Sequence, residues 1–198
     1  GANASFSTSD MKDEIFEGVK LFHFGYPPLL KRFYEDGGLQ LAAFMHSAQQ
    51  RQVITSLDMA LVEPDTEAGR LDWLQYLDRV LPNVDIFMPS FEEIYSMLRR
   101  SEYIANKDRA GLDMLTLADE PLLSNMADQL LELGPSIVGI KLGEHGLYVK
   151  TTGQAKRMAR LQRVLGIKLE QWAGLARHVP CYTVPICGTA GAGDATIA

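Results

Sequence analysis

The last eleven residues of the chain read Gly188-Thr189-Ala190-Gly191-Ala192-Gly193-Asp194-Ala195-Thr196-Ile197-Ala198. This glycine-rich turn follows an apolar segment, Tyr182 to Ile186, that we expect to be a β-strand. Glycines in such a turn let backbone N–H groups point inward around an anion, and the dipole of a following helix also favours negative charge. The turn therefore predicts a phosphate cradle between a strand and a helix.

Three other interpretations of this turn compete with the phosphate cradle. A Walker A loop needs Lys followed by Ser or Thr after the last glycine, but position 194 is Asp, which excludes it. A dinucleotide fingerprint needs Gly or Ala at position 196, where Thr196 stands. A tight structural turn capped by Asp194 remains an alternative when the short Gly-x-Gly-Asp pattern is considered alone.

Short apolar runs alternate with amphipathic stretches through the rest of the chain, which is typical of β-α units around a largely parallel sheet. A hairpin is expected where Leu147 to Lys150 follows a glycine-containing turn. The expected buried strands are Lys20 to Phe24, Val53 to Leu57, Val84 to Met88 and Ile137 to Leu142. The part from Gln162 to Arg177 is compatible with a helix or with a loop.

Three stretches have residues at helical spacing, and we expect each group to fall on one face of a helix. Trp73 and Trp172 lie in amphipathic segments and are expected in the core. The three predicted faces are Leu39, Ala42, Ala43 and His46; Leu71, Leu74 and Leu77; and Leu123, Met126, Leu130 and Leu133.

Taken as a whole string, Gly188 to Ala195 resembles the carboxyl-terminal signature of the phosphofructokinase-B (ribokinase-like) carbohydrate kinases, which usually reads Asp-Thr-x-Gly-Ala-Gly-Asp. The resemblance implies that the backbone of Gly191, Ala192 and Gly193 forms an anion hole and that Asp194 is the catalytic base. It also places Thr189 among the nucleotide-binding residues. Gly188 departs from the pattern, because family members often carry Asp at this position.

Other segments extend the resemblance over most of the chain. They are Gly1 to Ala4, Phe22 to Tyr26, Asp85 to Glu93 and Gly139 to Gly146. The implied fold is a three-layer α/β/α kinase core with a mostly parallel sheet, of which residues 1–198 are the middle and catalytic portion. An N-terminal part with a β lid, and C-terminal helices, are then expected outside this sequence. The sequence alone is expected to be inactive, since much of the adenine pocket should follow Ala198.

Ser90 and Glu93 have the spacing of a capping box, in which a hydroxyl and a carboxylate satisfy free N–H groups of a first helical turn. The resemblance adds a second role, because the family has an Asn-x-x-Glu motif in this region. By that resemblance Glu93 holds Mg²⁺ through water, although Ser90 stands where the family has Asn. The two roles are compatible with one another.

Lys141 ends an apolar strand, and ligands of open α/β sheets bind at the carboxyl ends of strands. We therefore expect Lys141 to reach an ATP phosphate, with Gly143 and Gly146 allowing a nucleotide close to the backbone. An exposed lysine beside a hairpin turn is the alternative. Asp58 likewise follows a strand, and its position suggests a weaker link to the site.

Composition limits the class of protein. The chain has 198 residues, 46% of them hydrophobic, and 19 Lys and Arg against 25 Asp and Glu, so a packed core is expected and a basic nucleic-acid surface is not. No apolar stretch approaches the roughly 20 residues of a membrane span, and we expect no signal peptide, because Gly1 to Ser5 lack a basic start and an apolar core. Cys181 and Cys187 are expected as buried, reduced thiols, and the four histidines share no metal-ligand spacing. We expect a soluble, cytoplasmic protein.

The resulting hypothesis is an ATP- and Mg²⁺-dependent kinase of a sugar hydroxyl, with no nucleic-acid or membrane partner. A nucleoside or a vitamin precursor is an alternative acceptor, because relatives perform the same chemistry on those. A non-catalytic relative that binds a sugar or nucleotide is the second alternative, which the departures at Gly188 and Ser90 leave open. Related kinases commonly pair through the lid, so a homodimer is compatible with the resemblance.

Overall fold

Four strands that alternate with helices form the parallel part of one six-stranded sheet, whose strand order follows the chain from β1 to β6. The computed structural model describes residues 2–109, 113–182 and 196. β1 to β4 are parallel, whereas β4, β5 and β6 are antiparallel neighbours. The strands are β1 (Leu21–Phe24), β2 (Ile54–Leu57), β3 (Ile86–Phe87), β4 (Ile137–Lys141), β5 (Leu147–Thr151) and β6 (Ala176–Val179).

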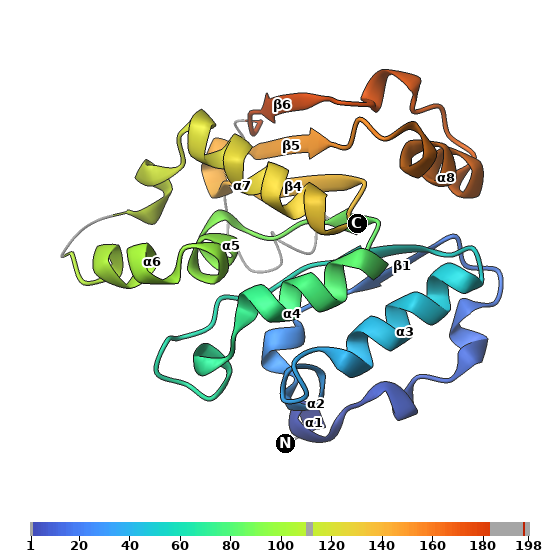
Figure 1. Cartoon of the computed structure of the whole chain (residues 1–198), viewed down its shortest axis with the longest axis horizontal. Helices are drawn as coiled ribbons and strands as arrows, with labels where there is room; N and C mark the ends of the chain where they lie inside the picture. The colour runs from blue at the N-terminus through green and yellow to red at the C-terminus, as the bar shows by residue number, and fades with distance from the viewer. Residues whose placement is uncertain (1, 110–112, 183–195, 197–198) are drawn as a thin grey trace.

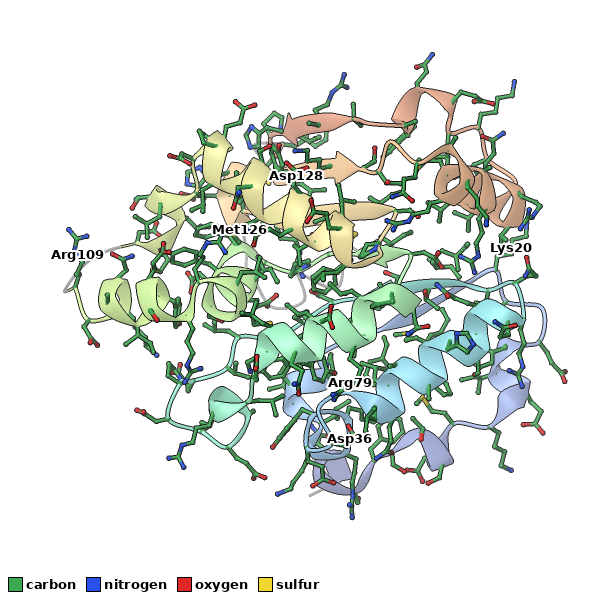
Figure 2. All side chains as sticks on the ribbon, in the orientation of Figure 1. Lys20, Asp36, Arg79, Arg109, Met126 and Asp128 are labelled. Carbon is green, nitrogen blue, oxygen red and sulfur yellow. The ribbon has the colours of Figure 1, made fainter. Side chains whose placement is uncertain are left out.

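One face of the sheet is covered by α3, α4, α5 and α7, which share a large hydrophobic core with β1 to β5 (Figure 1). In α7, Met126 is buried in this core whereas the side chain of Asp128 on the same helix is about half exposed (Figure 2). Within the described residues, no helix has both the length and the apolar character needed to cross a membrane. The helices are α1 (Ala2–Ser5), α2 (Lys31–Tyr34), α3 (Leu39–Gln50), α4 (Trp73–Val80), α5 (Phe91–Leu98), α6 (Arg100–Lys107), α7 (Glu120–Leu133) and α8 (Ala155–Leu165).

The opposite face of the sheet carries α8. Met158 and Leu161 of this helix pack on Ile54, Ile86 and Ile137, which begin β2, β3 and β4. Neighbouring residues of these strands, such as Leu57 and Phe87, belong to the other core, because successive side chains of a strand point to opposite faces. The expected three-layer α/β/α arrangement is confirmed.

Two of the predicted helix faces are buried only in part. In α3, Leu39, Ala43 and His46 are exposed, whereas Phe44 and Met45 are buried. This stretch is apolar on more than one side, and the face with the larger side chains is buried because it removes more apolar area from water. The buried residues of α3 are Leu41, Ala42, Phe44, Met45 and Ala48.

The buried side of α4 also differs from the predicted one, because the side with the larger apolar side chains is buried. Leu74 is exposed, whereas Trp73 and Tyr76 are buried together with Leu77 and Val80. The polar atoms of both aromatic side chains have backbone acceptors, since Trp73 Nε1 donates to Ala68 O at 2.9 Å and Tyr76 Oη donates to Phe33 O at 3.1 Å. The predicted face of α7 is confirmed for Leu123, Met126 and Leu130, with Leu133 partly buried.

The segment between β5 and β6 is a helix followed by a loop, so both interpretations of Gln162 to Arg177 hold for part of it. α8 ends at Leu165, and the chain then runs to β6 through a short 3₁₀ turn. Trp172 is 41% exposed and Cys181 is exposed, so their predicted burial is wrong. They follow α8 at the edge of the sheet, where every residue of β6 is exposed. Cys187 and most of the strand predicted over Tyr182 to Ile186 lie outside the described residues.

Candidate functional site

The parallel arrangement brings the carboxyl ends of β1 to β4 to one edge of the sheet. Asp58 follows the last residue of β2, and its N–H donates to Phe24 O at 3.1 Å. Lys141 is the last residue of β4, and its N–H donates to Pro89 O at 2.9 Å. Glu93 lies in the first turn of α5, which begins shortly after β3. Three charged residues thus lie at this edge of the sheet, one at or after the end of each of the strands β2, β3 and β4.

Asp58 and Lys141 form an ion pair with 2.5 Å between Oδ2 and Nζ. The Asp58 side chain is 0% exposed and that of Lys141 is 13% exposed. The second carboxylate oxygen of Asp58 accepts the N–H of Met59 at 2.8 Å. Burial raises the pKa of Asp58 above its ordinary value, although the Lys141 ammonium opposes this. The carboxylate therefore depends on Lys141 for its charge.

Glu93 belongs to the predicted capping box, which is confirmed. Its Oε2 accepts the N–H of Ser90 at 2.7 Å, and Ser90 is the N-cap of α5. Burial raises the pKa of Glu93 to about 7, and the negative charge of Asp58 acts in the same direction. The Ser90 hydrogen bonds and Lys141 act against the shift. Burial, together with the nearby charge of Asp58, therefore favours a proton on Glu93 near neutral pH.

His23 on β1 extends this polar row, a contact that the sequence did not suggest. Its Nδ1 lies 3.1 Å from the hydroxyl of Ser56, two residues before Asp58 on β2. The positive form of His23 favours the ionised form of Asp58. A histidine and a serine at paired positions of adjacent strands (His23 opposite Ser56) can be found only once the strand register is known.

The turn between β4 and β5 has the two glycines expected to admit a nucleotide. Gly143 has φ 56° and Gly146 has φ 95°, both in the region that favours glycine. A side chain at Gly146 would collide with the backbone, because a Cβ there would lie 2.1 Å from Val179 O. At Gly143 a Cβ would only touch Leu115, at 3.4 Å. Gly146 thus has a packing role against the end of β6 in addition to its predicted one.

Asp194, Gly191, Ala192, Gly193 and Thr189 lie outside the described residues. Their roles as base, anion hole and nucleotide contact therefore stay predictions from the sequence.

The edge of the sheet is chemically suited to Mg²⁺. This ion prefers oxygen ligands and is commonly held by one or two carboxylates, waters and substrate phosphates. The Glu93 carboxylate lies near that of Asp58. No cluster of three or more His, Cys, Asp or Glu side chains suited to a metal occurs in that part of the chain. Glu93 fits an ion whose other ligands are water and phosphate.

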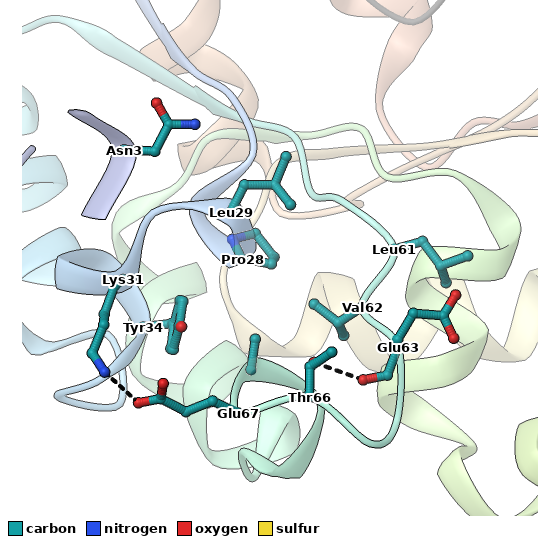
Figure 3. A pocket seen from close by; sticks show the side chains of 11 residues that line it. Asn3, Pro28, Leu29, Lys31, Tyr34, Leu61, Val62, Glu63, Thr66 and Glu67 are labelled. Atoms are coloured by element: carbon teal, nitrogen blue, oxygen red, sulfur yellow. Dashed lines mark hydrogen bonds and ion pairs between the residues drawn. The ribbon is translucent and has the colours of Figure 1, made fainter. Parts of the chain in front are cut away.

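A cavity of about 560 Å³ lies beside this edge (Figure 3). It is formed between the segment that follows β1 and the loop that follows Asp58. Lys31 and Glu67 form an ion pair of 2.7 Å at its wall, and Thr66 Oγ1 donates to Glu63 O at 2.7 Å. Asp58, Glu93 and Lys141 do not line it. The charged edge and this cavity are therefore separate features.

Several solved structures have the same fold as this chain over nearly its whole length. A ribokinase from Giardia lamblia covers 100% of this chain at 16% identity, with a TM-score of 0.58. A fructokinase with bound ATP from Xylella fastidiosa covers 98% at 15% identity, with a TM-score of 0.61. The chain has a ribokinase-like fold. A third structure with this fold, from E. coli, was solved with ATP and Mg²⁺ and covers 95% of the chain at 19% identity, with a TM-score of 0.56.

These ribokinase-like structures are about twice as long as the chain, which spans 47%, 47% and 46% of them. No model of a known protein family matches the sequence, and no curated protein matches it. At such identities the likeness is one of fold.

Proposed function

We propose that the protein transfers the γ-phosphoryl group of ATP to a hydroxyl group of a sugar. The observation that carries this proposal is the charge cluster of the buried Asp58 with the partly buried Lys141 and Glu93, at the carboxyl edge of a ribokinase-like sheet. Ligands of open α/β sheets bind at this edge. The ribokinase and the fructokinase of the same fold, and the ATP bound in the fructokinase, support the substrate class.

In this proposal Lys141 binds a phosphate oxygen, because its ammonium is held at the edge by Asp58. Glu93 holds Mg²⁺ through water, and the ion supplies positive charge against the phosphates. The ATP and Mg²⁺ found in the E. coli structure support both assignments. Gly143 lies in the turn directly after Lys141 and is exposed, so it leaves room for a nucleotide.

The chemical step rests on the signature string at residues 188–195. Asp194 accepts the proton of the acceptor hydroxyl while that oxygen forms a bond to the γ-phosphorus. The bond from this phosphorus to the β–γ bridging oxygen breaks, which gives ADP and a sugar phosphate. Backbone N–H groups of Gly191, Ala192 and Gly193 stabilise the charge that spreads over the transferred group. Thr189 adds a contact to the nucleotide.

The test is ADP release by the complete protein with a panel of sugars, nucleosides and vitamin precursors. We expect turnover with a sugar, and a loss of about 10²-fold or more in kcat for Asp194→Asn. ATP binding without turnover for any acceptor would identify a binding protein instead. Turnover confined to nucleosides would favour the alternative acceptor, which an aminoimidazole riboside kinase of the same fold supports.

A further inference from the structure

Among the described residues, the side chain of Lys141 has one hydrogen-bond partner. Its Nζ donates to Asp58 Oδ2 at 2.5 Å, and this is its single hydrogen bond within the described residues. An ammonium group carries three N–H donors. Two donors of Lys141 are thus left for another acceptor, on a side chain that is 13% exposed.

Asp58 is placed so that it can hold the lysine without moving. Its side chain is fully buried, and its second oxygen is bound by the N–H of Met59 at 2.8 Å. Its own N–H is tied to β1 through Phe24 O. A lysine has a long, flexible side chain, and ordering such a side chain on binding costs free energy, which a preformed contact removes.

We infer that Asp58 is a positioning residue that holds the Lys141 ammonium ready for a phosphate group of the nucleotide. This inference rests on the proposed function and deepens it, because it assigns the step that prepares the phosphate site to a carboxylate on another strand. The phosphate takes the two remaining donors, so the Asp58 contact is kept when ATP binds. Asp58 acts through Lys141 and does not touch the substrate.

The alternative is that Asp58 competes with phosphate for the ammonium. The two roles predict opposite signs. Removal of a competing carboxylate makes the site more positive and tightens ATP binding, whereas removal of a positioning carboxylate frees the lysine and weakens it. Replacement of Asp58 therefore decides between them.

The experiment is a double-mutant cycle on the complete protein, with affinities for ATP and adenosine measured by calorimetry. Lys141→Met should weaken ATP binding by about 10- to 100-fold, as expected for a lost charge-assisted hydrogen bond. Asp58→Asn and Asp58→Ala should weaken it by about 2- to 10-fold, with the larger effect for alanine. In the Lys141→Met background, Asp58→Ala should change the affinity by less than about 2-fold. Adenosine binding should stay unchanged throughout.

A matched control is the ion pair of Lys150 with Asp128, 2.6 Å apart and away from the edge, between β5 and α7. Lys150→Met should leave ATP binding as it is. Folding of each variant is checked by circular dichroism, and Asp58→Asn serves if Asp58→Ala does not fold. Tighter ATP binding in the Asp58 variants, or equal effects of Asp58→Ala with and without Lys141, would overturn the inference. A wild-type protein that binds ATP but phosphorylates no acceptor would sink the proposed function and leave this cycle interpretable.

Discussion

Asp58 and Lys141 are 83 positions apart in the chain, yet their carboxylate and ammonium meet at 2.5 Å across the end of the intervening strand β3. Both charges are largely removed from water. Each partner therefore needs the other, because a single buried charge without its counterion is costly.

Loss of Lys141 should destabilise the protein through Asp58. We expect Lys141→Met to lower the free energy of unfolding by about 3 kcal/mol, and the double variant Asp58→Asn/Lys141→Met to regain most of it. Lys150→Met is the control, with an expected loss of at most about 1 kcal/mol because Asp128 is half exposed. Urea unfolding measures all four proteins. Equal losses for the two lysine variants would contradict the prediction.

Arg160 of α8 should stabilise the amino-terminal side of the sheet. Its guanidinium forms an ion pair with the buried Asp85 and donates to Val53 O at 2.9 Å. Asp85 also accepts the N–H of Thr55 at 2.9 Å. Arg160→Met should therefore lower the free energy of unfolding by about 3 kcal/mol, because it leaves Asp85 without its counterion. Thermal unfolding of the variant and the wild type measures this loss.

Arg163 provides the control for this variant. It lies on the same helix, is exposed, and donates to Gln52 at 3.3 Å. Arg163→Met should change stability by no more than about 0.5 kcal/mol in the same thermal unfolding measurement. A similar effect of both substitutions would mean that α8 is held by its apolar face alone.

Glu93 should make stability depend on pH. Burial raises its pKa from 4.5 to about 7, so the folded protein keeps a proton that the unfolded chain has released between these values. The contribution of Glu93 to the free energy of unfolding is fully present below pH 4.5 and is lost as the pH rises through 7. The total loss is at most about 3 kcal/mol. Urea unfolding from pH 5 to 8 without Mg²⁺ should show this loss in the wild type and not in Glu93→Gln. A constant difference between the two proteins over this range would refute it.

Gly146 should tolerate no side chain. Its φ is 95°, and a Cβ would lie 2.1 Å from Val179 O, so Gly146→Ala must displace the end of β6. We expect the free energy of unfolding to fall by about 3 kcal/mol or more, and the amides of β6 to be less protected from hydrogen exchange. Gly143→Ala is the matched control, because Gly143 also has a positive φ but has only Leu115 nearby, and about 1 kcal/mol is expected there. Unchanged protection of β6 in Gly146→Ala would contradict the packing role.

Strands, the hairpin and the capping box could be predicted because they depend on residues close together in the sequence. The pattern of Ile137 to Leu142 followed by a glycine turn and Leu147 to Lys150 predicts two paired strands, and β4 and β5 pair there. Ser90 and Glu93 are three positions apart, so their spacing alone predicts the bond of 2.7 Å. The position of Lys141 at a strand end likewise follows from the sequence.

Only the tertiary structure decided which sides of α3 and α4 are buried and which charges pair. Apolar residues occur on several sides of α3, and the choice among them depends on the area that the sheet can cover. The partners of Lys141 and Arg160 lie 83 and 75 positions away, at places that meet only through the order and register of the strands. Local sequence sets local hydrogen bonds, whereas a contact between distant residues exists only after the whole sheet has formed.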